Sequence, residues 1–199
     1  AEVVIPASDR LRVKTGARVD WVEVSAGPGV ITRGALFGAP LDVLGPDRDN
    51  SFDLWSAYVT ADYVLTDELT ANIGFALAQR PPTLTELYAM RPFESVLQQG
   101  LNRIQGFPLL DPERLKQIDV GLRAENERFR GGIRGFYSWI DDYITSQGIA
   151  VDPTSSSSRI TSVFVNTPLA TLAGGEAFGE YEVDQNISLF GGDWRAKRT

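Results

Sequence analysis

The sequence predicts an all-β fold, an antiparallel up-and-down meander, and three observations predict it. Apolar and polar residues alternate along most segments, which places successive side chains on opposite faces of a strand. Very short polar turns join these segments into hairpins. Long connections, roughly at 25–50, 81–113 and 145–162, separate one hairpin from the next. Because short and long connections strictly alternate, all the turns are expected on one rim of the sheet and all the long loops on the other.

Each strand is expected where the alternation is cleanest. In LTANIGFALAQR, which begins at Leu69, Ile73 and Phe75 share one face while Thr70 and Asn72 share the other. Three-residue polar turns at 66–68, 126–128 and 184–186 close the hairpins. About seven strands are expected, roughly at 10–24, 51–65, 68–80, 114–125, 128–144, 163–183 and 186–195.

The third of these strands runs directly into two prolines. Proline has no backbone N–H to donate to a sheet, so Pro81 and Pro82 mark the point where the chain leaves the sheet. The residues at 83–90 are good helix formers. We therefore expect a short helical turn within the 81–113 loop.

The alternation alone is equally typical of a soluble sheet with one wet face and of a transmembrane β-barrel. Large aromatic residues near strand ends, such as Trp21, Trp55 and Trp139, fit a girdle at a lipid interface. The polar face favours the barrel, because it is charged densely enough to line a water-filled or plugged lumen. Its charged members are Arg12, Lys14, Arg18, Asp20, Asp119, Arg123, Arg130 and Arg134.

The expected strand number bears on whether the barrel is complete. An open sheet cannot sit in a bilayer, where every backbone polar group needs a partner, and bacterial barrels normally have an even number of strands. Seven strands would also place the two ends of the chain on opposite rims. We therefore expect residues 1–199 to form about seven strands of a larger barrel.

The composition excludes several classes of function. With 26 acidic against 19 basic residues and a net charge of −7, the chain is a poor candidate for binding nucleic acid. It contains neither Cys nor His, so it lacks thiolate ligands, the commonest metal ligand and the usual general base. No enzyme activity, cofactor or metal site is expected. The pair Asp141-Asp142 is interpreted as a strand end, with a hard-cation site as the alternative.

Five segments, in this order, carry a resemblance to a known family. They are Arg80-Pro81 with Glu86-Leu87-Tyr88, then 108–113 (PLLDPE), 117–122 (QIDVGL), 136–144 (FYSWIDDYI) and 166–176 (NTPLATLAGGE). Together they resemble the barrel of TonB-dependent outer-membrane receptors over about residues 51–195. The departures are minor: Phe107 replaces the usual Asn before Pro108, and Gly174-Gly175-Glu176 stands where Gly-Val-Glu is commoner.

The resemblance implies a function, a location and partners. It implies TonB-coupled uptake of a scarce, bulky solute, most often a ferric siderophore, across the outer membrane of a Gram-negative-type bacterium. The partners implied are the TonB complex, acting through a plug that these residues do not include, the siderophore itself, and outer-membrane lipid. A soluble β-sheet binding module and a non-TonB outer-membrane barrel, such as a barrel lipase or protease, are the alternatives.

Members of this family bind ligand with their extracellular loops and the top of the plug. The resemblance therefore places candidate ligand contacts at the 81–113 loop, and the alternative role for each residue is packing within that loop. The candidates are Arg80, Glu86, Tyr88, Arg91, Asn102 and Arg103.

Overall fold

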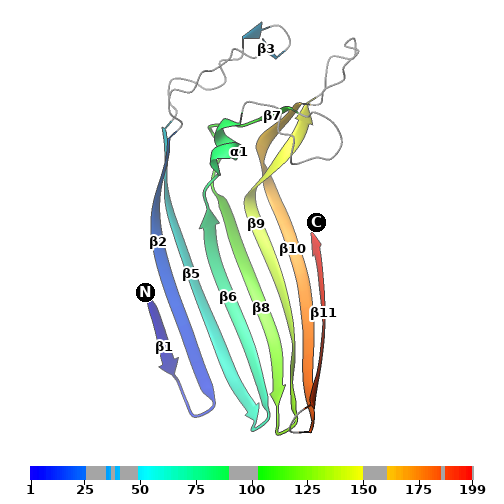
Figure 1. The fold of residues 1–199 in the computed structure, drawn as a ribbon. Coiled ribbons are helices and arrows are strands. Elements are labelled where there is room, and N and C mark those ends of the chain that lie inside the picture. Colours follow the sequence, from blue (N-terminus) through cyan, green and yellow to red (C-terminus); the bar gives the residue numbers. More distant parts are fainter. Residues whose placement is uncertain are drawn as a thin grey trace.

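The computed structural model describes residues 1–25, 35–36, 39–40, 49–89, 103–149, 161–184 and 187–198. Its main element is one curved antiparallel sheet that is open at both edges (Figure 1). The strands follow the order of the sequence: β1 (Glu2–Pro6), β2 (Leu11–Ser25), β5 (Asp49–Thr66), β6 (Leu69–Arg80), β8 (Glu113–Glu125), β9 (Phe129–Ile149), β10 (Thr161–Asp184) and β11 (Ile187–Arg198).

Three short strands and one helix complete the described elements. The strands β3 (Ala35–Leu36) and β4 (Ala39–Pro40) pair only with each other, and β7 (Arg103–Gln105) runs parallel to the start of β10. The helix is α1 (Leu84–Tyr88), which lies at the upper end of the sheet in Figure 1. Among the described residues, no helix has the length and apolarity needed to cross a membrane.

The seven expected strands are all present, and an eighth, β1, precedes them. Five residues that end in a proline gave too short a pattern to predict a strand. Polar contacts hold this edge strand: Glu2 pairs with Lys14 of β2 at 3.2 Å and accepts a hydrogen bond from the Tyr58 hydroxyl of β5. With eight strands, the first and last run in opposite directions, so the expectation that the chain ends face opposite rims was wrong.

The prediction that turns and loops sort onto two rims is confirmed (Figure 1). Each short turn spans few residues and can be stabilised by hydrogen bonds within the turn itself. For example, the Asn126 side chain accepts hydrogen bonds from the backbone N–H groups of Arg128 and Phe129, at 3.1 and 2.8 Å. At the opposite rim β6 ends at Arg80, as the two following prolines predict. We call these the short-turn rim and the long-loop rim.

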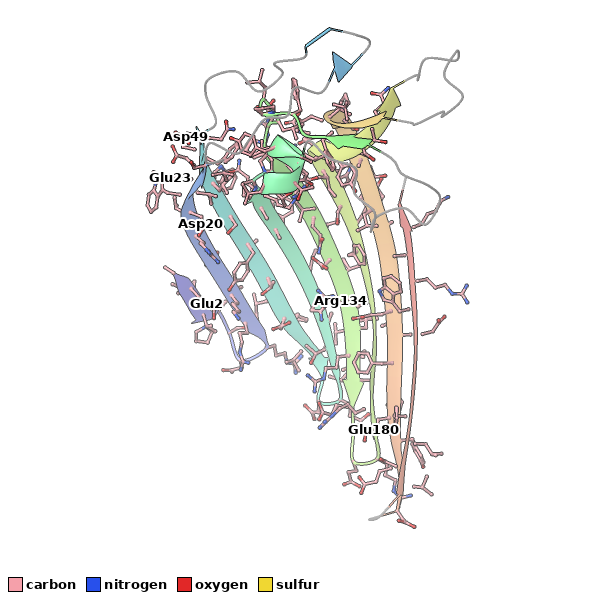
Figure 2. The ribbon with its side chains drawn as sticks, turned by 45° about the horizontal axis from the view of Figure 1, so that its top comes forward. Glu2, Asp20, Glu23, Asp49, Arg134 and Glu180 are labelled. Atoms are coloured by element: carbon pink, nitrogen blue, oxygen red, sulfur yellow. The ribbon has the colours of Figure 1, made fainter. Side chains whose placement is uncertain are left out.

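Cross-strand pairing shows that the charged residues predicted on one face do share it. Arg12 lies opposite Asp62, which lies opposite Asn72, and the same row continues through Gly121 to Arg134. Ion pairs link this inner face: Arg134 contacts Asp119 at 3.2 Å, partway up the wall in Figure 2.

The opposite, outward face is apolar and exposed. Its large residues include Val59, Ile73, Phe75, Val120 and Ile133, whose exposed fractions run from 43% to 58%. Although 43% of the sequence is apolar without counting proline, the described residues bury only five side chains of that set: Leu54, Leu87, Leu110, Ile144 and Ala170. A soluble sheet would cover such a face with a second layer, whereas a barrel wall leaves it to lipid.

The two faces should respond differently to the same charge. We expect Val59→Arg, on the outward face of β5, to lower the free energy of unfolding of the full-length protein in a bilayer by about 2–4 kcal/mol, the cost of an arginine near the midplane. The neighbouring Thr60→Arg projects to the inner face and should cost far less. Guanidinium titration in phospholipid vesicles measures both values, and equal costs would contradict the assignment of the faces.

Candidate functional site at the long-loop rim

A single helical turn follows the end of β6, and its local sequence explains it. Thr83 is the N-cap of α1: its side chain accepts a hydrogen bond from the Glu86 backbone N–H, at 3.3 Å. The Glu86 carboxylate accepts one from the Thr83 backbone N–H in return, at 2.7 Å. This reciprocal capping box satisfies N–H groups that a helix start otherwise leaves unpaired. The expected helical turn within residues 83–90 is therefore confirmed.

Arg80 connects this helix to the sheet. Its Nε donates to Glu113 of β8 at 2.7 Å, and its two terminal nitrogens donate to the two carboxylate oxygens of Glu86 at 3.0 and 3.1 Å. The other oxygen of Glu113 accepts the backbone N–H of Ile144 in β9, at 2.8 Å. One guanidinium thus holds together β6, α1 and, through Glu113, β8 and β9. Bidentate, charge-assisted pairs such as Arg80–Glu86 fix the relative orientation of the two side chains as well as their distance.

The environment of Glu86 lowers its pKa. Partial burial acts to raise the pKa, but the hydrogen bonds from Arg80 and Thr83 outweigh burial and bring it below the ordinary value of 4.5. Glu86 is therefore ionised at neutral pH and is held by its two partners.

A small apolar core lies beneath α1. Leu87 is fully buried and packs with Leu110 and Ile144, while Phe52, on the inner face of β5, covers its side. The returning chain approaches closely at Gly106, where a Cβ atom would lie 2.4 Å from the Tyr88 nitrogen. Only glycine fits there.

Backbone and side-chain hydrogen bonds tie the returning chain to α1. Backbone N–H groups of Gly106 and Phe107 donate to the carbonyls of Ala89 and Glu86, at 2.6 and 2.8 Å. Asn50 of β5 donates to both the Tyr88 hydroxyl, at 2.7 Å, and the Pro108 carbonyl, at 3.2 Å. We call residues 80–89 and 106–113 together the rim clamp.

Asn166 of β10 fixes the far end of the rim clamp. Its side chain accepts the backbone N–H of Asp111 at 2.9 Å and donates to the carbonyls of Asp111 and Asp142, at 3.0 and 2.7 Å. Sequence reasoning noted this residue within the motif at 166–176 but gave it no role. The sequence carries no signal for Asn50, because its role depends on a hydrogen bond to Tyr88, 38 residues away along the chain.

The structure brings together three of the six candidate ligand contacts. Arg80, Glu86 and Tyr88 belong to the rim clamp, and Arg80 and Glu86 engage each other. Arg103 opens β7, whose backbone pairs with β10. Arg91 and Asn102 lie outside the described residues.

The carboxylates of Asp141 and Asp142 are engaged in ion pairs. Asp141 contacts Lys116 at 2.7 Å and Asp142 contacts Arg114 at 2.6 Å. Within the part of the chain that the structure describes, no group of three acidic residues is placed to hold a metal ion.

Comparison with known protein families identifies the family of this chain. A family model described as "TonB dependent receptor-like, beta-barrel" matches residues 1–197. The chain belongs to the TonB-dependent receptors. This confirms the resemblance carried by the five sequence segments. No curated protein matches the sequence.

Solved structures of metal and siderophore transport proteins share the fold. The copper transporter OprC superposes with a TM-score of 0.74 at 20% identity, covering 99% of this chain and 28% of its own. The siderophore receptor PirA from Pseudomonas aeruginosa gives 0.71 at 15% identity, over 100% of this chain and 33% of its own. The FrpB iron transporter from Neisseria meningitidis gives 0.61 at 15%, over 99% and 24%. The chain thus spans a third or less of each of these proteins.

Removing the central guanidinium should loosen the rim clamp locally. We expect Arg80→Ala to lower the free energy of local opening by about 1–2 kcal/mol, since its charge-assisted bonds are lost but its side chain is 41% exposed and partly screened. Hydrogen exchange at the Leu87 and Phe107 amides reports the change. Arg114→Ala, which removes a more exposed pair, is the control and should stay within about 0.5 kcal/mol. Equal effects would contradict the central role of Arg80.

Acid should open the rim clamp in a defined direction. Because folding lowers the pKa of Glu86, its contribution is fully present above the ordinary value of 4.5 and is lost as pH falls through the lower folded value. Protection of the Leu87 amide, corrected for intrinsic exchange, should fall in that window. Glu86→Gln should have low protection at every pH and no such step; a step that persists in this variant would assign it to another group.

Proposed function

We propose that this chain is part of the barrel of an outer-membrane receptor that takes up a ferric siderophore by TonB-coupled transport. The observation that carries the proposal is the family match over residues 1–197, on a sheet with an apolar outward face and long loops on one rim. The family is found in the outer membrane of Gram-negative bacteria, and we assign this chain to the same location. The proposal includes a plug and further barrel strands contributed by residues other than 1–199.

The choice of solute rests on chemistry as well as on relatives. Structural relatives include a copper transporter, siderophore receptors and a hemophore receptor. Copper favours imidazole and soft sulfur ligands, but this stretch contains no His or Cys and a single Met. A ferric chelate instead presents its own oxygen shell and charge, which Arg, Asn and Tyr side chains can contact by hydrogen bonds. The residues available at the long-loop rim therefore suit a ferric chelate better than a copper ion.

The rim clamp suggests how the candidate residues divide. Arg80 and Glu86 engage each other, so we propose that they hold the loop, while Arg91, Asn102 and Arg103, on the 90–105 segment between the two halves of the clamp, contact ligand. Tyr88 lies at the junction, held by Asn50.

Uptake of a labelled ferric chelate tests this proposal. Cells producing the full receptor should accumulate radioactive iron from a ferric catecholate only when TonB is present. Arg91→Ala with Arg103→Ala should weaken chelate binding about a hundredfold, as expected for two charge-assisted contacts. Arg128→Ala, on the short-turn rim, is the matched control and should bind normally. Uptake that is independent of TonB, or no dependence on the receptor for any ferric chelate, would contradict the proposal.

A further inference from the structure

The outward face of β10 is unusually shallow. Between the large residues Leu169 and Tyr181, this face carries only small side chains, while the neighbouring β9 carries Ile133, Tyr137 and Trp139. A mostly apolar groove of about 550 Å³ opens at its lower end; its lining includes Phe129, Ile133 and Leu122 and one carboxylate, that of Asp193. We call the small residues the β10 trough: Thr171, Ala173, Gly175, Ala177 and Gly179.

Three glycines in and beside the trough are not required by the packing of this chain, whereas a Cβ atom at Gly131 or Gly175 would lie 2.8 or 3.3 Å from a backbone oxygen. A Cβ atom at Gly191 of β11 would meet nothing within 4 Å, and those at Gly135 and Gly179 would meet ordinary contacts at 3.8 and 3.5 Å. None of the three has a positive φ. Glycine inside a strand weakens it and often marks a place where a ligand approaches closely. The missing side chains at these three positions leave open space on the outward face.

Charged residues line the trough on the opposite side from β9. Asp193, Arg195 and Lys197 of β11 lie opposite Ala177, Gly175 and Ala173, so all three project from the outward face. Arg195 contacts Asp193 at 3.2 Å, with side chains 88% and 70% exposed. Charge on a lipid-facing surface is tolerated only near the headgroups. In Figure 1, β11 ends at about the height where β6 ends, while β9 and β10 continue above it, and Lys197 lies opposite Ala173 within β10.

We propose that the trough and the two basic residues of β11 bind a lipid with an anionic phosphate headgroup. The acyl chain lies in the trough and continues into the apolar groove toward the short-turn rim. The phosphate lies between Arg195 and Lys197, beside the ring of Tyr137, which is of the type that favours lipid interfaces. The inference rests on the proposed membrane location but on neither the solute nor TonB.

Charge complementarity favours this occupant. Asp193 offsets one of the two β11 cations, which leaves a net positive charge beside the trough. Among the described residues, the outward cations of β8, Arg114 and Lys116, already pair with Asp142 and Asp141. The unpaired positive charge that an anionic headgroup needs therefore lies on β11, above the apolar groove.

Native mass spectrometry of the full receptor, purified in a neutral detergent, tests the site. The probe is dioleoylphosphatidic acid, with dioleoylphosphatidylcholine and inorganic phosphate as comparisons. We expect selective retention of the phosphatidic acid. Arg195→Gln with Lys197→Gln should weaken it about thirtyfold, from about fivefold per cation. Arg18→Gln is the matched control, because Arg18 also pairs with an Asp two residues away but on the inner face.

A second variant tests the trough independently of charge. Gly191→Leu should fold normally, because its side chain would project from the outward face and no described atom of this chain lies within 4 Å of its Cβ position, and it should lower phosphatidic acid retention severalfold by filling the groove. Folding is checked by gel mobility without boiling. The proposal is overturned if inorganic phosphate competes as well as the lipid, if the double variant retains lipid like the wild type, or if the trough proves to be covered by a second receptor copy that Gly191→Leu releases.

Discussion

Every feature of this structure depends on one constraint: neighbouring side chains along each strand must face different surroundings. Because the period of a strand is two, one misplaced residue in register would move every apolar side chain to the polar face. The pairing keeps rows such as Val59, Phe75 and Ile118 together on the outward face across three strands. With so few buried apolar residues, the sheet has no conventional core to correct an error. Backbone pairing takes its place and, at the proposed membrane location, so does the surrounding lipid.

The rim clamp holds the strand ends at the long-loop rim, where the pairing of the sheet stops. Where strands leave the sheet, their backbone groups lose partners and the chain is free to move. Here Arg80 and the core around Leu87 gather the ends of β6, β8 and β9 with α1. The long 81–113 connection is thereby held at both ends, which explains how a loop of that length can be compatible with an ordered rim. Its function as a ligand-binding surface would depend on this anchoring.

Much of the fold could be predicted because its signals are local. Alternation predicts strands, two prolines predict the end of β6, and the helix formers at 83–90 predict a short helical turn. The edge strand β1 escaped prediction because its five residues gave too short a pattern and its anchors lie on other strands. For the same reason sequence could name Arg80 and Glu86 as notable but could not show that they engage each other. Pairings between distant segments leave no periodic trace in the sequence.

The face assignment is tested most directly by a spin-label scan along β8. Single cysteine variants at residues 114–125 of the full receptor, in phospholipid vesicles, would each carry a nitroxide label. Oxygen, which concentrates in lipid, should relax labels at Ile118, Val120 and Leu122 most strongly. A water-soluble nickel reagent should instead favour Asp119 and Arg123. A period of two with these phases supports the account; the opposite phase, or no periodicity along the strand, would contradict it.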